Sequence, residues 1–204
     1  MRFKKFTRAF GAGALAVALG SWGHTASAET PLQHGKYLVT VMGCTDCHTP
    51  GSFLGHPDMT RFLGGSDVGF SIPGLGVFVG RNLTPDAETG LGKWTTQQVV
   101  TAFTTGVRPD GRILAPIMPY DDFKSLTKAD ALAIGAYLKS LKPVKHAVPG
   151  PFGPNETPTT FVMTVVPGQV YANMPKPPGP PAGDPPPGAG GPLGARPASG
   201  SPPK

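Results

Sequence analysis

Apolar residues recur at helical spacing in three segments of the chain. In residues 128–141, Ile134, Tyr137, Leu138 and Leu141 follow an i, i+3, i+4, i+7 pattern, which places them on one face of a helix. The other two segments are residues 33–43 and 95–106. They carry Tyr37, Leu38, Val41 and Met42 in the first, and Val99, Val100, Ala102 and Phe103 in the second. The pattern predicts three helices that share one apolar core.

Local signals mark the ends of these predicted helices. Residues 95–98 (Thr-Thr-Gln-Gln) and 127–130 (Thr-Lys-Ala-Asp) are capping signatures at helix starts. Gly43, Gly106 and Pro143 supply the stops. Gly35 and Gly135 are expected to let the first and last helices cross closely, or else to loosen helix ends or lie on exposed faces.

A glycine-rich stretch at residues 63–80 separates the first predicted helix from the second. It is compatible with a short hairpin or an irregular loop. It lacks both the lysine of a P-loop and a GxGxxG register, so we do not expect it to bind phosphate.

The start of the chain has the pattern of a secretory signal peptide. Four basic residues precede an apolar stretch at residues 10–19, and Ala26-Ser27-Ala28 supplies small residues for cleavage. The apolar stretch is shorter than the roughly 20 residues that a membrane-spanning helix needs. We therefore expect residues 1–28 to be removed after Ala28, leaving a periplasmic mature chain without a transmembrane segment.

Proline content divides the mature chain into two parts. From residue 149 onward there are 17 of the 26 prolines, in a sequence that is also rich in glycine. Such a composition favours extended chain and offers little apolar surface to offset the entropy of ordering. We predict one small domain at residues 29–147, followed by a Pro/Gly-rich tail at residues 148–204 that is irregular to residue 175 and disordered beyond it.

The charge of the mature chain is close to balanced. The full sequence carries a net +6, but the signal peptide holds four of the 18 basic residues and no acidic one, which leaves 14 basic against 12 acidic residues, or +2. This balance gives no support for nucleic-acid binding. Lys93, Arg108, Arg112 and Lys124 are interpreted as ordinary solvated charges, with an acidic partner as the alternative.

Both cysteines of the chain lie in one short motif, Cys44-Thr45-Asp46-Cys47-His48. The CxxCH spacing predicts covalent attachment of one haem c through Cys44 and Cys47, with the imidazole of His48 beneath the iron. A structural zinc site would need a second Cys/His pair, which the sequence lacks. A thioredoxin-type redox pair usually follows a strand, whereas this motif follows a predicted helix. Export also favours haem, because bacteria attach it on the far side of the inner membrane.

The distal side of the porphyrin calls for a second iron ligand, and Met118 is the best placed candidate. A thioether is a weak neutral donor that favours ferrous iron. The chain passes through a whole predicted helix before it reaches Met118, and Pro116 and Pro119 stiffen the approach. The alternatives are His56, His146, or a vacant sixth site with Met118 as a core residue.

Over residues 33–151 the sequence resembles the class I c-type cytochromes, and more closely the periplasmic haem subunits of bacterial alcohol, aldehyde, gluconate and related dehydrogenases. The motifs that carry the resemblance are residues 43–49 (GCTDCHT), 82–94 (NLTPDAETGLGKW), 110–112 (DGR), 116–120 (PIMPY) and 136–141 (AYLKSL). The resemblance implies an all-α class I cytochrome c fold, with three or more helices around one covalently bound haem. It also implies thioethers at Cys44 and Cys47, and His48 and Met118 as proximal and distal iron ligands. The chain departs from larger members in having one haem motif rather than two or three.

These features together predict an electron carrier and not an enzyme. We expect a partner dehydrogenase, periplasmic or membrane-associated, to supply single electrons that then pass to the respiratory chain. One alternative is a haem enzyme or a gas or redox sensor with an open sixth site, and another is a scaffold subunit that recruits a partner through its proline-rich tail. Arg81, Trp94 and Tyr120 are candidates to line the pocket or bond the haem propionates, or else are packing residues and a surface charge.

Overall fold

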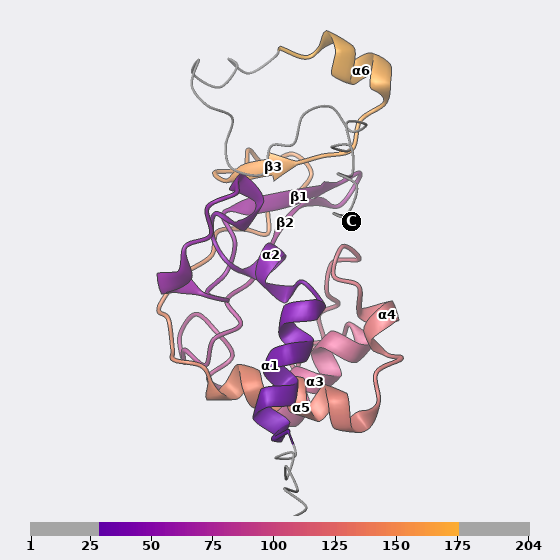
Figure 1. Ribbon diagram of the computed structural model, residues 1–204. Helices are drawn as coiled ribbons and strands as arrows, with labels where there is room; N and C mark the ends of the chain where they lie inside the picture. The colour runs from indigo at the N-terminus through magenta and orange to yellow at the C-terminus, as the bar shows by residue number, and fades with distance from the viewer. Residues whose placement is uncertain (1–28, 176–204) are drawn as a thin grey trace, which may run out of the picture. The chain divides into compact units, whose positions relative to one another are not determined.

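The computed structural model describes residues 29–175 of the 204-residue chain (Figure 1). The predicted signal peptide with its cleavage site after Ala28, and residues 176–204 of the predicted tail, lie outside the described residues. The chain divides into two compact units, one ending at Met163 and the other beginning at Thr164. Each is described by itself.

The three longest helices of the first unit are the three that the sequence predicts. They are α1 (Pro31–Val41), α3 (Thr96–Thr105) and α5 (Lys128–Ser140). The capping box that starts α3 is confirmed, because Thr95 accepts from the Gln98 amide and the Gln98 side chain accepts from the Thr95 amide. Gly106 ends this helix with φ +74°, a left-handed conformation that favours glycine. α1 begins two residues earlier than predicted, because Thr30 and Gln33 form a further capping box.

The core lies where these three helices meet. Val39, Phe103 and Leu138 are among its buried residues, one from each helix. Gly35 allows the predicted crossing of α1 and α5, because a Cβ at this position would overlap the carbonyl oxygen of Ala133. Gly135 faces α3 instead, where a Cβ would lie 3.0 Å from Cγ2 of Thr96. Burial of this shared apolar surface holds the helices together.

Two short helices and two 3-10 turns join the longer elements. They are α2 (Cys44–His48), the turns Ser52–Leu54 and Met59–Arg61, and α4 (Tyr120–Phe123). Figure 1 shows α1, α3 and α5 gathered at one end of the first unit and the strands at the other, with α2 between them. The motif that carries both cysteines therefore lies between the helical core and the sheet.

The sheet has three strands in the order β2-β1-β3. The glycine-rich stretch folds as a hairpin of β1 (Val68–Ile72) and β2 (Gly76–Val79), with Gly69 opposite Val79. β3 (Phe161–Met163) pairs in parallel with β1, with Val68 opposite Phe161. The expectation of an all-α fold therefore holds only in part: helices form the core, and a small mixed sheet covers one end.

The first unit continues beyond residue 147, the predicted end of the haem domain. Val77 and Phe152 exchange two backbone hydrogen bonds of 2.8 and 2.9 Å. β3 then adds a third strand to the sheet. Proline content alone did not reveal this extension, because non-proline residues such as Phe152 and Val162 still provide the backbone amides that pair.

The second unit contains one short helix, α6 (Gly168–Asn173), with no buried residue. Across the residues that the structure describes, no helix has both the length and the apolar character required to cross a membrane.

Candidate haem-attachment site

The CxxCH motif forms one short helix, α2. It begins at Cys44, directly after Gly43, whose φ of +67° makes the sharp turn out of α1. Cys44 and Cys47 are both partly buried and are not joined in a disulfide. Because Cys44 and Cys47 are three residues apart, helical geometry places them on the same side of α2. This is the arrangement that two bonds to one porphyrin require.

His48, the last residue of α2, is held in one orientation by a backbone carbonyl. Its ring is buried, and Nδ1 lies 2.7 Å from the carbonyl oxygen of Arg81. A carbonyl can only accept, so Nδ1 carries the proton and donates it. Burial lowers the pKa of His48, which favours the neutral imidazole. Nε2 therefore keeps a free lone pair, as an iron-binding histidine requires.

Close backbone packing brings the Arg81 carbonyl to His48. Gly80 precedes Arg81, and a Cβ at Gly80 would overlap the carbonyl oxygen of Cys47. On the other side, the amide of Gly65 donates to the carbonyl oxygen of His48 at 2.8 Å. Glycines at positions 65 and 80 thus allow the chain to enclose α2 from two directions.

The two thiols do not have the character of a redox or zinc site. Burial raises the pKa of the Cys44 thiol to about 11. Burial, with a smaller effect of the Asp46 charge, also raises the pKa of Cys47. A reactive dithiol instead has a lowered pKa. Over residues 29–175 there is also no group of three or more His, Cys, Asp or Glu side chains able to hold a metal ion, so a zinc site lacks ligands.

Met118 lies in a turn directly before α4. Its amide donates to the carbonyl oxygen of Ala115 at 2.9 Å, and its own carbonyl oxygen accepts from Tyr120 at 2.8 Å. The side chain is partly buried and packs against the same core cluster as Cys44. The structure thus places the candidate distal ligand and one candidate attachment cysteine around one buried cluster.

The other candidate ligands have different surroundings. His56 is exposed. Nδ1 of His146 donates to the carbonyl oxygen of Gly64 at 2.8 Å, and Nε2 lies 3.5 Å from a guanidinium nitrogen of Arg61. Met59 is 63% exposed. Met118 is partly buried, whereas His56 and Met59 are exposed and both ring nitrogens of His146 already contact other groups.

The motif at residues 82–94 builds a rigid loop beside the site. Asn82 is 2% exposed, and its side-chain amide donates to Thr89 and to the carbonyl oxygen of Val144 at 3.0 and 2.7 Å. Its side-chain oxygen accepts from the amide and the hydroxyl of Thr84. Asp86 in turn accepts from the amide and the hydroxyl of Thr89. The loop follows directly from Arg81, so this network fixes the residue that holds His48.

Arg108 is a residue whose position the sequence did not reveal. The sequence predicts a solvated charge at this position, but the side chain is partly buried and its guanidinium lies 5.5 Å from the ring centre of Trp94. Its Nε is buried and has no hydrogen-bond partner among the described residues. Trp94 also packs against the core. Tyr120 packs its ring against Gly106, where a Cβ would lie 3.0 Å from the ring.

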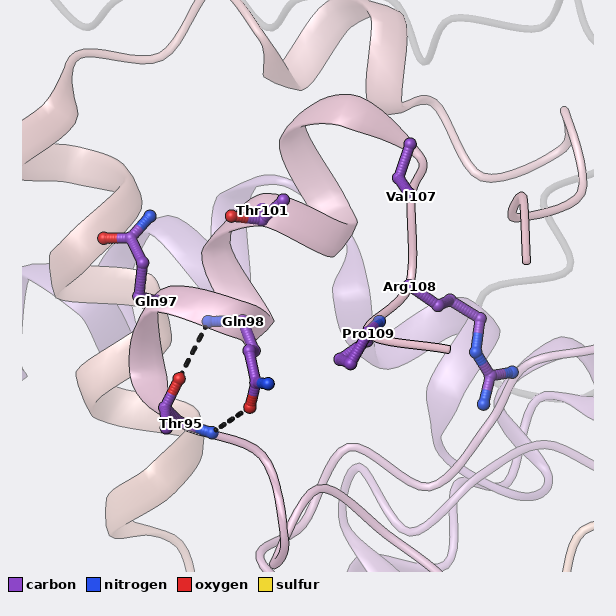
Figure 2. Close-up of a pocket in the computed structure, with 7 residues that line it drawn as sticks. All are labelled: Thr95, Gln97, Gln98, Thr101, Val107, Arg108 and Pro109. Atoms are coloured by element: carbon purple, nitrogen blue, oxygen red, sulfur yellow. Dashed lines mark hydrogen bonds between the residues drawn. The ribbon is translucent and has the colours of Figure 1, made fainter. Parts of the chain in front are cut away.

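A shallow surface pocket lies at the start of α3 and is separate from α2 (Figure 2). It is lined by Thr95, Gln97, Gln98, Thr101, Val107, Arg108 and Pro109. Figure 2 shows the side chain of Arg108 extending away from the Thr95 end of the pocket. Arg108 lines it, whereas Cys44, Cys47, His48 and Met118 do not.

The residues of this site fit a haem. Two thiols and a neutral, oriented imidazole lie within one short helix, and a buried guanidinium nitrogen nearby lacks a partner among the described residues. A covalently bound porphyrin needs the first set of groups, and its carboxylates need a cation.

Comparison with known proteins finds relatives that are named as subunits of bacterial dehydrogenases. No family model matches the chain. The chain is 36% identical over 135 residues to the fructose dehydrogenase cytochrome subunit of Gluconobacter japonicus, which covers 62% of this chain and 26% of that protein. It is 32% identical over 133 residues to the cytochrome c subunit of the quinone-dependent alcohol dehydrogenase of Gluconobacter oxydans, covering 65% and 26%.

A further relative belongs to a different dehydrogenase. The chain is 32% identical over 131 residues to one of the subunits of the nicotinate dehydrogenase of Pseudomonas putida, covering 64% of this chain and 10% of that protein. The chain thus spans between a tenth and about a quarter of the length of these three relatives.

Proposed function

The chain is a relative of the cytochrome c subunits of bacterial dehydrogenases, and from this premise we propose that it is a periplasmic electron carrier with one haem c. Cys44 and Cys47 bind the haem through thioethers, and His48 and Met118 are the iron ligands. Bound haem supplies one-electron chemistry between ferrous and ferric iron. A dehydrogenase partner donates the electrons, and the respiratory chain accepts them. Residues 1–28 direct export and are removed after Ala28.

The single observation that carries this proposal is the hydrogen bond between His48 and Arg81. It fixes the tautomer of a buried, neutral imidazole and leaves Nε2 with a free lone pair, in the same short helix as the two thiols. Orientation by a carbonyl is typical of metal-binding histidines and also raises the basicity of the ligand. The names of the relatives support the same cofactor independently.

The chain's own residues set the conditions for electron transfer. With haem bound, His48 and Met118 would both coordinate the iron, which would leave no position for a substrate. The Arg81 carbonyl limits movement of His48, and the turn at Ala115 and Pro119 limits movement of Met118. A site whose geometry changes little with oxidation state favours rapid transfer across a small contact with a partner.

Mass spectrometry of exported protein tests the cofactor. The full chain is expressed in a bacterium with working cytochrome c maturation, and the periplasmic product is weighed intact. We expect the polypeptide from Glu29 plus one haem, and bare polypeptide for the C44A/C47A double variant. Bare polypeptide from the unmodified chain would overturn the proposal.

The ferric absorption spectrum tests the distal ligand. A methionine–iron bond gives a weak band near the red edge of the spectrum, and we expect Met118→Ala to abolish it and to allow carbon monoxide to bind the ferrous protein readily. Met59→Ala is the matched control and should leave the band unchanged, because that side chain is mostly exposed. An unaltered spectrum in Met118→Ala would contradict the ligand assignment. An unmodified protein that binds carbon monoxide without losing a ligand would instead favour a sensor or enzyme.

A further inference from the structure

Two partly buried arginines near the candidate haem-attachment site lack a carboxylate of their own: Arg81 has none among the described residues, and Arg108 shares Asp110 with Arg112. Arg81 is partly buried, and its guanidinium donates to the carbonyl oxygen of Val148 at 2.5 Å. Among residues 29–175 it forms no ion pair. The charges that act on its pKa are those of Arg108 and Arg112, and both lower it, as burial also does. Arg81 therefore lies in a field of like charge.

Arg108 has the same need for an anion. It lies in the turn at residues 107–113, where Val107 pairs with Ile113 and the Arg108 amide donates to the carbonyl oxygen of Arg112. Its Nε is buried without a partner in the described part of the chain. Asp110 lies 3.5 Å from its terminal nitrogen, but the same carboxylate oxygen accepts from Nε and a terminal nitrogen of Arg112 at 3.0 and 2.7 Å.

The charges of this arginine cluster (Arg81, Arg108 and Arg112) and Asp110 do not balance. Three guanidinium groups face one carboxylate, which leaves a charge of +2. Arg112 is exposed and paired with Asp110, so the excess lies on Arg81 and Arg108, which are partly buried. Partly buried like charges are costly unless an anion joins them. A haem carries two propionate carboxylates, which match this excess in number and sign.

We propose that Arg81 and Arg108 bind the two haem propionates of this chain through charge-assisted hydrogen bonds. The inference rests on the proposed function and assigns the two carboxylates of the cofactor to two named side chains. The planar guanidinium presents several N–H groups to one carboxylate, which an ammonium group cannot do in the same way. Trp94 and the Val148 carbonyl hold the two guanidinium groups in place.

This assignment makes Arg81 a positioning residue with two contacts to the haem site. Its carbonyl oxygen orients His48, while its guanidinium would hold a propionate. The cations also favour the ferrous state, because reduction adds a negative charge to the site. Loss of either cation should therefore lower the midpoint potential.

The test compares charge removal with charge retention in the haem-loaded full chain. We expect R81Q and R108Q each to lower the ratio of ferrous to ferric protein at a fixed ambient potential by about threefold to tenfold, where tenfold corresponds to 59 mV for one electron. R81K and R108K should recover most of this loss. The control R61Q removes an arginine that is already paired with Asp58 at 2.7 Å, and should leave the ratio unchanged.

Infrared difference spectra between the two redox states give a second measurement. In protein that carries haem labelled with 13C at the propionate carboxyls, the labelled bands should shift in R81Q and R108Q but not in R61Q. Labelled bands that are the same in all three variants would overturn the propionate assignment, as would midpoint potentials equal to that of R61Q. Unmodified protein without covalent haem would instead overturn the proposed function. The two failures are therefore distinguishable.

Discussion

At the scale of single residues, buried side chains with every polar atom bonded keep the site in shape. Asn82 is the clearest case, because it joins Thr84, Thr89 and Val144, which lie up to 62 residues away along the chain. Such a side chain cannot be replaced without leaving some buried partner unsatisfied. The stability of the loop that carries Arg81 therefore depends on it.

We expect Asn82→Ala to lower the free energy of unfolding by about 2–4 kcal/mol, because the buried Thr84 amide loses its acceptor and the Val144 carbonyl keeps only its longer bond from the Thr84 hydroxyl. Denaturant titration followed by circular dichroism measures the change. Asn155→Ala is the control, since Asn155 is exposed and should change stability by no more than about 0.5 kcal/mol. Equal stability of the two variants would show that the network contributes nothing.

At the scale of elements, an ion pair between His34 and Asp130 joins α1 and α5, in addition to the close crossing of these helices at Gly35. Nε2 of His34 lies 2.7 Å from a carboxylate oxygen of Asp130. The hydrogen bond to Asp130 raises the pKa of His34 above 6.5, and the bond to His34 lowers the pKa of Asp130. The contact between the two helices is therefore sensitive to pH.

The sign of this effect follows from the direction of the His34 shift. Below pH 6.5 His34 is protonated in both folded and unfolded chains, and its stabilising contribution is complete. As the pH rises through the raised pKa, the folded chain loses that proton and the contribution disappears. We expect the unmodified protein to lose stability relative to His34→Gln above pH 6.5.

Urea unfolding of both proteins over several pH values measures the difference. His56→Gln, at an exposed position, is the control and should follow the unmodified protein. Parallel curves for the unmodified protein and His34→Gln above pH 6.5 would contradict the expectation.

Elements differ in how far the sequence could predict them. The sequence predicts the start of α3 from Thr95 and Gln98, because a capping box involves only four consecutive residues. The pairing of β3 with β1 joins residues 68 and 161, and nothing in either short segment specifies the other. The buried position of Arg108 depends likewise on Trp94, which lies in a different segment. The sequence therefore predicts a helix start that depends on neighbouring residues, but not contacts between segments that lie far apart along the chain.

At the scale of the whole molecule, the first unit depends on chain beyond residue 147. Its sheet needs Phe152 and β3, and the Arg81 guanidinium needs the Val148 carbonyl. The predicted CxxCH site is confined to five consecutive residues, whereas the residues packed around it, such as Gly65, Gly80 and Arg81, come from other parts of the chain. We therefore expect the first unit to be complete only when the chain extends to Met163.

Two truncations test this boundary. We expect a chain that ends at Met163 to keep the spectrum, the midpoint potential and the stability of the full protein. A chain that ends at Ala147 loses the Val77–Phe152 pairing, β3 and the Val148 contact, and should be destabilised by about 3 kcal/mol or more, at about 1 kcal/mol for each lost hydrogen bond. Thermal unfolding of the two haem-loaded proteins measures the difference. Equal melting temperatures would place the boundary at residue 147 after all.

The hydrogen bond between His48 and Arg81 spans 33 positions of sequence, and that between Arg81 and Val148 spans 67. Neither contact exists until segments far apart in the sequence have come together, so the thiols of Cys44 and Cys47 are unenclosed in the unfolded chain. If haem is attached as proposed, attachment is therefore expected to precede the packing that encloses these two side chains.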